Sequence, residues 1–159
     1  MKICIDSQIV IWGIKKQGDG DMVEIATHFF KWADEHNHQI VIPTIVVGEV
    51  LSPEPAAKRA QIYNELENGF IIAPYDALCA LRYAELIHNK GIDVIKDEIK
   101  EIGISRQKMK CDYLIIATAL ATQSNCIYSY DDGVTKFSKG VIDVRELPPL
   151  PPKQNLLFP

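Results

Sequence analysis

Short apolar runs alternate along the chain with longer stretches in which apolar residues recur at helical spacing. The β-prone runs end at polar residues or prolines and predict strands over residues 2–5, 39–42, 70–73, 126–128 and 141–144. The helical spacing predicts helices over residues 9–12, 21–35, 45–51, 54–68, 76–90, 93–102, 111–123 and 133–139. Strands that alternate with helices are typical of an α/β fold with a mostly parallel central sheet.

The stretch from Lys110 to Asp132 predicts one buried helix followed by one buried strand. The expected helix, residues 111–123, is apolar on nearly every face, which is typical of a helix inside a structure. Its charged residue is Asp112, placed by this prediction in the first turn, after a polar, basic loop over residues 103–108. A carboxylate beside so apolar a unit is costly unless a cation or a hydrogen-bond donor meets it.

Other acidic residues are expected at the same edge of the sheet, because ligand sites of parallel sheets lie beyond the carboxyl ends of the strands. Asp6 ends the first strand, with Ser7 after it as a helix cap, Glu49 lies in the helix after the second strand, and Asp131 and Asp132 end the fourth. Each also has an ordinary interpretation. Asp112 would favour a helix N-terminus, Asp6 would cap the next helix, Glu49 would be a surface charge, and Asp131 would belong to a turn.

Each of these ordinary interpretations is acceptable alone, but together they would leave several carboxylates close to one another without a counter-charge. Close carboxylates repel one another by about 4 kcal/mol per pair at an effective dielectric near 20. Such a cluster persists if it binds a hard divalent cation or is partly protonated. All-oxygen ligands favour Mg²⁺ or Mn²⁺, and the usual chemistry at such sites is attack of a metal-activated water on a phosphodiester.

Composition and charge limit the partners and the location. The 159 residues carry a net charge of −4 with a pI of about 5.5, so any nucleic-acid contact has to be local. The four cysteines show no CxxC spacing. No apolar run approaches the ~18 residues of a membrane span, and the first residues do not have the layout of a signal peptide. We therefore expect a soluble, cytoplasmic protein without membrane contact.

Four segments, ICIDSQIVIW, IPTIVVGEVL, CDYLIIATALA and IYSYDD, resemble the acidic motifs of PIN-domain proteins, especially the VapC-like toxin ribonucleases. The resemblance covers residues 2 to about 147. It implies a PIN-like three-layer α/β/α sandwich with a mostly parallel central sheet. It also implies Mg²⁺- or Mn²⁺-dependent endoribonuclease activity, a homodimer and an inhibitory antitoxin protein. We expect a nuclease domain over residues 1–147 and a proline-rich arm over 148–159 that packs on its own domain or on a dimer mate.

The resemblance assigns roles to individual residues. The metal-binding and catalytic acids match Asp6, Glu49, Asp112 and Asp131. Ser7 and Ser129 match the supporting polar residues of the first and last motifs. Two departures leave questions open: Asp132 could share or replace the role of Asp131, and the segment 91–110 is longer than in the smallest members of the family.

An RNA substrate also needs cations, and the best local candidates lie next to the expected site. We expect phosphate contacts from Lys15, Lys16, Arg106, Lys108 and Lys110. The alternative function is a catalytically silent PIN-like module that binds RNA or protein. The presence of all four acids favours the enzyme, because a silent site would be expected to lose at least one of them.

Overall fold

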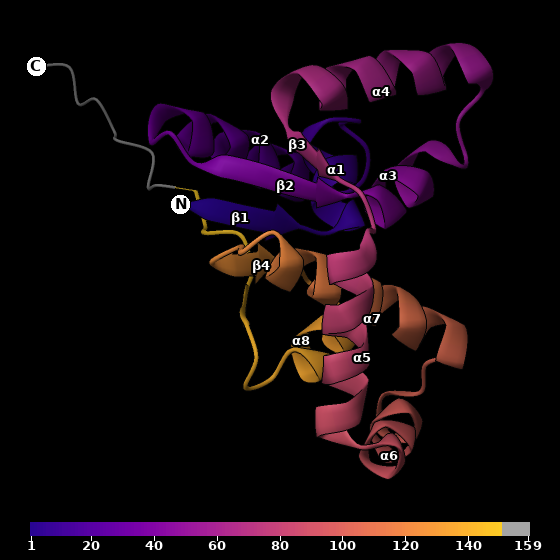
Figure 1. Ribbon diagram of the computed structural model, residues 1–159. Helices are drawn as coiled ribbons and strands as arrows, with labels where there is room; N and C mark the ends of the chain where they lie inside the picture. Colours follow the sequence, from indigo (N-terminus) through magenta and orange to yellow (C-terminus); the bar gives the residue numbers. More distant parts are fainter. Residues whose placement is uncertain (151–159) are drawn as a thin grey trace, which may run out of the picture.

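A five-stranded parallel sheet forms the centre of the computed structural model, which describes residues 1–150 (Figure 1). The strand order is β3-β2-β1-β4-β5, and every neighbouring pair is parallel. The strands are β1 (Lys2–Ile5), β2 (Gln39–Pro43), β3 (Ile71–Ala73), β4 (Cys126–Tyr128) and β5 (Asp143–Arg145). This confirms the predicted parallel sheet, with boundaries that shift by one or two residues.

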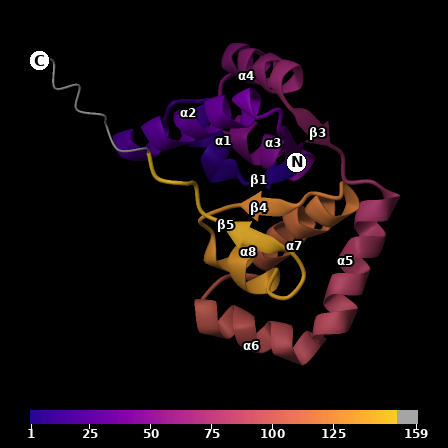
Figure 2. The same cartoon turned by 90° about the vertical axis from the view of Figure 1, so that its left-hand side faces the viewer.

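Helices cover both faces of the sheet, which gives the predicted three layers (Figures 1 and 2). One layer contains α1 and α2, and the opposite layer contains α5, α7 and α8. Helix α3 follows β2, α4 packs against α3 and β3, and α6 joins α5 to α7 at the end remote from the sheet. The bounds are α1 (Ser7–Gly13), α2 (Gly20–Glu35), α3 (Thr44–Leu51), α4 (Ala56–Gly69), α5 (Ala77–Lys90), α6 (Ile92–Ile102), α7 (Arg106–Ala121) and α8 (Asp132–Phe137).

Local sequence signals explain where several helices begin and end. The Asp76 side chain accepts a hydrogen bond from the Cys79 N–H at 2.9 Å and caps α5, as predicted. Gly91 ends that helix with a φ of +83°, a conformation that favours glycine. Helix α1 begins at Ser7, and its N-cap is Asp6 rather than Ser7, because the Asp6 carboxylate accepts from the Ser7 N–H.

The core fills both sides of the sheet, between the strands and the helices that cover them. Ile3, Ile5 and Ile127 are fully buried, as expected for parallel strands covered on both faces. On α7, Tyr113 is fully buried and stacks on Phe137 of α8 with ring centroids 4.9 Å apart. The prediction that α7 is an interior helix is confirmed.

The predicted start of α7 is wrong. The helix begins at Arg106, five residues before the expected Cys111, so part of the predicted loop over 103–108 is helical. Its N-cap is Ser105, whose hydroxyl accepts from the Lys108 N–H at 3.1 Å. The polar first turns hid this extension, because they lack the apolar periodicity of the buried part. Asp112 therefore lies inside the helix and not in its first turn, and the helix-start interpretation of this residue is lost.

Most of the arm predicted over 148–159 lies outside the described residues. Residues 148–150 belong to no helix or strand, and residues 151–159, with Leu156, Leu157 and Phe158, lie outside the described residues. None of the helices within residues 1–150 combines the length and apolar character needed to cross a membrane.

Candidate active site

One cavity of about 470 Å³ opens at the carboxyl ends of the central strands. It is lined by four acidic side chains from four elements: Asp6 after β1, Glu49 on α3, Asp112 on α7 and Asp131 after β4. Asp132 is exposed and is not part of this lining. The order of the strands in the sheet brings these residues together, because β1 lies between β2 and β4.

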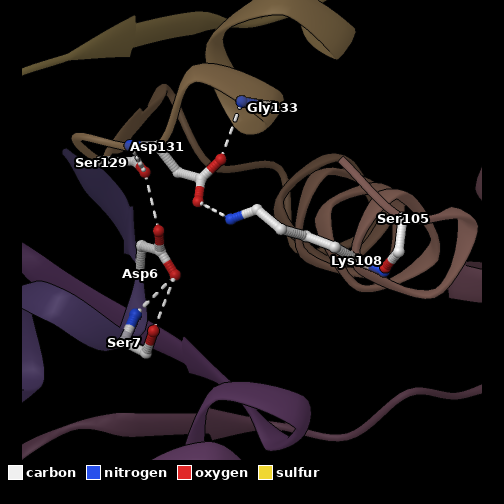
Figure 3. A network of polar contacts seen from close by, with 7 residues as sticks. All are labelled: Asp6, Ser7, Ser105, Lys108, Ser129, Asp131 and Gly133. Atoms are coloured by element: carbon white, nitrogen blue, oxygen red, sulfur yellow. Dashed lines mark hydrogen bonds and ion pairs between the residues drawn. The ribbon is translucent and has the colours of Figure 1, made fainter. Parts of the chain in front are cut away.

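Hydrogen bonds hold Asp6 and Asp131 in place (Figure 3). One Asp6 oxygen accepts from the Ser7 N–H at 2.6 Å, and the other accepts from the Ser129 hydroxyl at 2.7 Å. The Ser129 oxygen in turn accepts from the Asp131 N–H at 3.0 Å, and Asp131 Oδ1 accepts from the Gly133 N–H at 2.7 Å. Ser129 thus links the ends of β1 and β4, since it bonds to both acidic residues.

Asp112 is in a different state. The residue is 5% exposed, and its Oδ2 atom is buried without a hydrogen-bond partner. Burial, reinforced by the negative charges of Asp131, Asp6 and Glu49, raises the pKa of Asp112 to about 7, although Lys108 opposes the shift. An unsatisfied, buried carboxylate oxygen is expensive in a folded protein, so this atom is a strong candidate ligand for a cation.

The backbone of Gly133 approaches Asp112 closely. A Cβ atom at residue 133 would overlap Asp112 Oδ2 and would come within 3.0 Å of Asp131 Oδ1. Glycine is therefore required where α8 passes the two carboxylates. The sequence predicts Asp131 as a site acid and a helix from residue 133, but it does not predict this close approach. The available signal was the glycine directly after two acidic residues.

Glu49 lies at the exposed rim of the cavity. Its pKa is raised above the usual range, first by desolvation and then by the charge of Asp6, with a smaller contribution from Asp131. The Ser7 side chain and Lys108 partly offset this shift. The acidic side chains therefore interact electrostatically across the whole cavity.

Lys108 supplies a cation at this cavity. Its ammonium group forms an ion pair with Asp131 Oδ2, and this contact raises the pKa of the lysine (Figure 3). Lys108 and Asp112 are four residues apart on α7, so they lie on the same face of the helix. The ammonium group is thus positioned among the carboxylates by the first turns of α7, which sequence reasoning had assigned to a loop.

The carboxylate oxygens of the cavity suit a hard divalent cation, although they are not close enough to one another to form a complete metal site. Within residues 1–150, no three His, Cys, Asp or Glu side chains stand ready as the ligands of one metal ion. The unpartnered Asp112 Oδ2 and the raised pKa values of Asp112 and Glu49 nevertheless indicate a lack of positive charge at this cavity. Carboxylate oxygens are the ligands that Mg²⁺ and Mn²⁺ prefer.

The other predicted RNA contacts have different surroundings. Lys15 is 3% exposed at its side chain, because its ammonium group is paired with Glu54 and bonded to the Val50 carbonyl. Lys16 donates to the Thr27 hydroxyl at 2.6 Å, away from the cavity lining. Arg106 and Lys110 are exposed on α7. Of the five predicted cations, Lys108 is the one that lines the acidic cavity.

Comparisons with known proteins bear on the fold. The family model described as PIN domain matches residues 3–140. The structure is similar to VapBC2 from Rickettsia felis bound to a DNA fragment from its promoter, with a TM-score of 0.61 and 18% identity over 92% of this chain and 98% of that chain. It is also similar to a toxin–antitoxin complex from Klebsiella pneumoniae, with a TM-score of 0.55 and 19% identity over 93% and 99% of the respective chains. A comparison with curated proteins finds no match.

Proposed function

The chain belongs to the PIN domain family, and from this membership and its acidic cavity we propose that it is a metal-dependent endoribonuclease that cleaves RNA phosphodiester bonds. One observation carries the proposal. Four carboxylates from separate elements line a single cavity, and one of them, Asp112, keeps a buried oxygen without any partner. A purely structural role would leave that oxygen uncompensated.

The residues proposed to hold Mg²⁺ or Mn²⁺ are Asp6, Glu49, Asp112 and Asp131. A divalent cation at such a site activates water for attack and offsets the negative charge of a phosphodiester. Asp131 is preferred over Asp132, because Asp131 lines the cavity and Asp132 does not. We therefore assign the role of the fourth acid to Asp131, and the position of Asp131 in the lining supports this choice.

The chain's own residues supply orientation, proton transfer and substrate binding. The hydroxyl groups of Ser129 and Ser7 both donate to Asp6, at 2.7 and 3.3 Å, so these serines act as positioning residues. Glu49, exposed at the rim with a raised pKa, accepts the proton of the attacking water at its carboxylate. Lys108, with Arg106 and Lys110 on the same helix, contacts RNA phosphates. Lys15 is left out because its ammonium group is buried in an ion pair.

The proposed partners follow from the structural neighbours. One similar structure is VapBC2 and the other is described as a toxin–antitoxin complex. This similarity supports a role as the toxin of a type II pair with an antitoxin protein as partner. A homodimer belongs to the same proposal. Co-purification with the product of a small adjacent reading frame, and the mass of the free protein in solution, test these two points.

The activity is tested with purified protein, labelled single-stranded RNA and Mn²⁺. Wild type is expected to cleave, and cleavage is expected to disappear in EDTA and in Asp6→Asn. The matched control is Asp132→Asn, which removes a neighbouring carboxylate outside the cavity and should cleave like wild type. Cleavage that persists in Asp6→Asn would contradict the proposed site.

The second candidate function is a silent module that binds RNA or protein. The observation that favours it is the ion pair between Lys108 and Asp131, which neutralises part of the acidic cluster without a metal. This alternative predicts RNA binding without cleavage and no change of Tm with Mn²⁺. Stabilisation of wild type by Mn²⁺ that is lost in Asp6→Asn would exclude it.

A further inference from the structure

Lys108 has surroundings that no other lysine or arginine of the described chain shares. Its ammonium group contacts Asp131 across the cavity, from one helical turn before Asp112. The Lys108 side chain is 46% exposed and that of Asp131 is 18% exposed, so the ion pair lies at the mouth of the cavity rather than in the core. The Ser105 cap fixes the first turn of α7 and with it the origin of this side chain.

The ammonium group interacts electrostatically with every acidic side chain of the cavity. Its positive charge opposes the raised pKa of Asp112 and of Glu49, and Asp6, Asp112 and Asp131 all favour its protonated form. It is also the sole cationic side chain in the lining of this cavity. Lys108 therefore provides the positive charge that four converging carboxylates require.

A divalent cation and this ammonium group have to compete for Asp131. The Asp131 Oδ1 atom is occupied by the Gly133 N–H, and the Oδ2 atom is occupied by Lys108. A metal held by Asp131 would lie close to the lysine, and because two cations at one carboxylate repel each other, displacement of the lysine would be favoured. Because the side chain is long and half exposed, it can move to solvent without disturbing the fold.

We propose that Lys108 is a built-in counter-ion of the active site, which pairs with Asp131 when no divalent cation is bound and is released toward the cavity mouth when one binds. This inference rests on the proposed metal-dependent function. It adds a coupling: metal binding frees a positive charge at the place where an RNA phosphate has to be held. The apoprotein is thereby stabilised, at the expense of metal affinity.

The first test is the affinity of Mn²⁺ for the intact protein, measured by titration calorimetry in wild type, Lys108→Met, Lys108→Arg and Lys110→Met. Loss of the competing charge should tighten Mn²⁺ binding in Lys108→Met by about five- to tenfold, at the lower end of typical coupling between competing ligands. Lys108→Arg keeps the charge and should bind no more tightly than wild type. Lys110→Met loses the same charge on the same helix without a contact to Asp131, and controls for the general electrostatic effect.

The second test follows the lysine itself. Lys108 and Lys110 are acetylated side by side in one sample, and their labelling rates are measured by mass spectrometry with and without Mn²⁺. Release from Asp131 should make Lys108 label faster when Mn²⁺ is present, while the exposed Lys110 changes little. Equal responses of the two lysines would overturn the proposal.

The outcomes separate this inference from the proposed function. If wild type binds Mn²⁺ and Lys108→Met binds it no more tightly than Lys110→Met, the counter-ion role is wrong and the metal site stands. If Mn²⁺ binds neither wild type nor Lys108→Met, both proposals are overturned. Tighter binding that is specific to Lys108→Met, together with metal-dependent labelling of Lys108, supports both.

Discussion

The acidic cavity is built from two unlike pairs of carboxylates. Asp6 and Asp131 follow strands, and each of their oxygens has a hydrogen-bond or ion-pair partner. Asp112 and Glu49 lie on helices, and their pKa values are raised because burial and like charges are not fully compensated. Every oxygen of the strand pair has a partner within the protein, whereas Asp112 has a buried oxygen without a partner and Glu49 is exposed at the rim.

The difference shows how the protein can hold four acids together and remain folded. The strand-end acids are integrated into caps and turns, so they stabilise the edge of the sheet whether or not a ligand is bound. The helix-borne acids carry the unfavourable electrostatics of the cluster. We expect the same substitution, aspartate to asparagine, to have opposite effects on stability at Asp112 and at Asp6.

The largest expected effect is on cleavage in Asp112→Asn. Removing a proposed metal ligand should lower the cleavage rate by at least about a hundredfold, since even loss of a residue that orients a ligand costs 10–100-fold. At the same time, the metal-free variant should be more stable than wild type above pH 7, because no buried charge has to form. Asp6→Asn should lose both activity and stability. Urea unfolding and an RNA cleavage assay measure the two quantities, and a destabilised Asp112→Asn would contradict the contrast.

The pH dependence of stability comes next in size. The folded pKa of Asp112 is about 7 and its unfolded value is 3.8, so the folded protein binds the proton more tightly. Stability from this group is therefore greatest below pH ~4 and is lost as the pH rises to about 7. The loss is at most about 4 kcal/mol, at ~1.4 kcal/mol per pKa unit. Urea unfolding in EDTA from pH 4 to 8 should show a fall that is smaller in Asp112→Asn.

A smaller effect is expected from Ser129→Ala, which removes the hydroxyl between Asp6 and Asp131. One buried hydrogen bond from serine and one to it are lost, so we expect a destabilisation of about 1–2 kcal/mol and a cleavage rate roughly tenfold lower. The control is Ser138→Ala. Ser138 is equally buried and bonds to the Thr135 carbonyl, so its loss should affect stability without affecting cleavage.

The smallest effect on function is expected from Lys15→Met. Lys15 is paired with Glu54 and is buried, so its loss should lower the Tm without changing the Kd for RNA by more than about twofold. A clear loss of RNA affinity in Lys15→Met would place the RNA path across the connection between α1 and α2.

The variant Lys108→Met should instead reduce the salt dependence of RNA binding by about one charge, as expected for a phosphate contact.

The sequence was sufficient to predict the parallel sheet and its strand-end acids, because strand ends are marked by short apolar runs that stop at polar residues. Asp6 and Asp131 occupy such positions, and β1 and β4 lie side by side in the sheet. The assignment to the family is confirmed by the match over residues 3–140. The roles of individual acids stay predictions until the variants are measured.

Other features could not be predicted, for physical reasons. The first turns of α7 face water, so they carry no apolar period, and their helical state depends on the Ser105 cap. Because the sequence did not predict a helix over residues 106–110, it did not predict that Lys108 lies one helical turn before Asp112. The burial of Lys15 also depends on a partner in the distant α3–α4 connection, and pattern analysis does not detect such contacts.

The hydrogen bond between Ser129 and Asp6 has a consequence for synthesis in the cell. It joins residues 123 positions apart, and β4 takes its place beside β1 after most of the chain has been made. A ribosome-bound chain that ends before residue 126 therefore lacks β4, Ser129 and Asp131 and has an incomplete cavity. The order of strands in the sheet thus delays the assembly of the cavity until translation is nearly finished, so the proposed nuclease site would be incomplete in a growing chain.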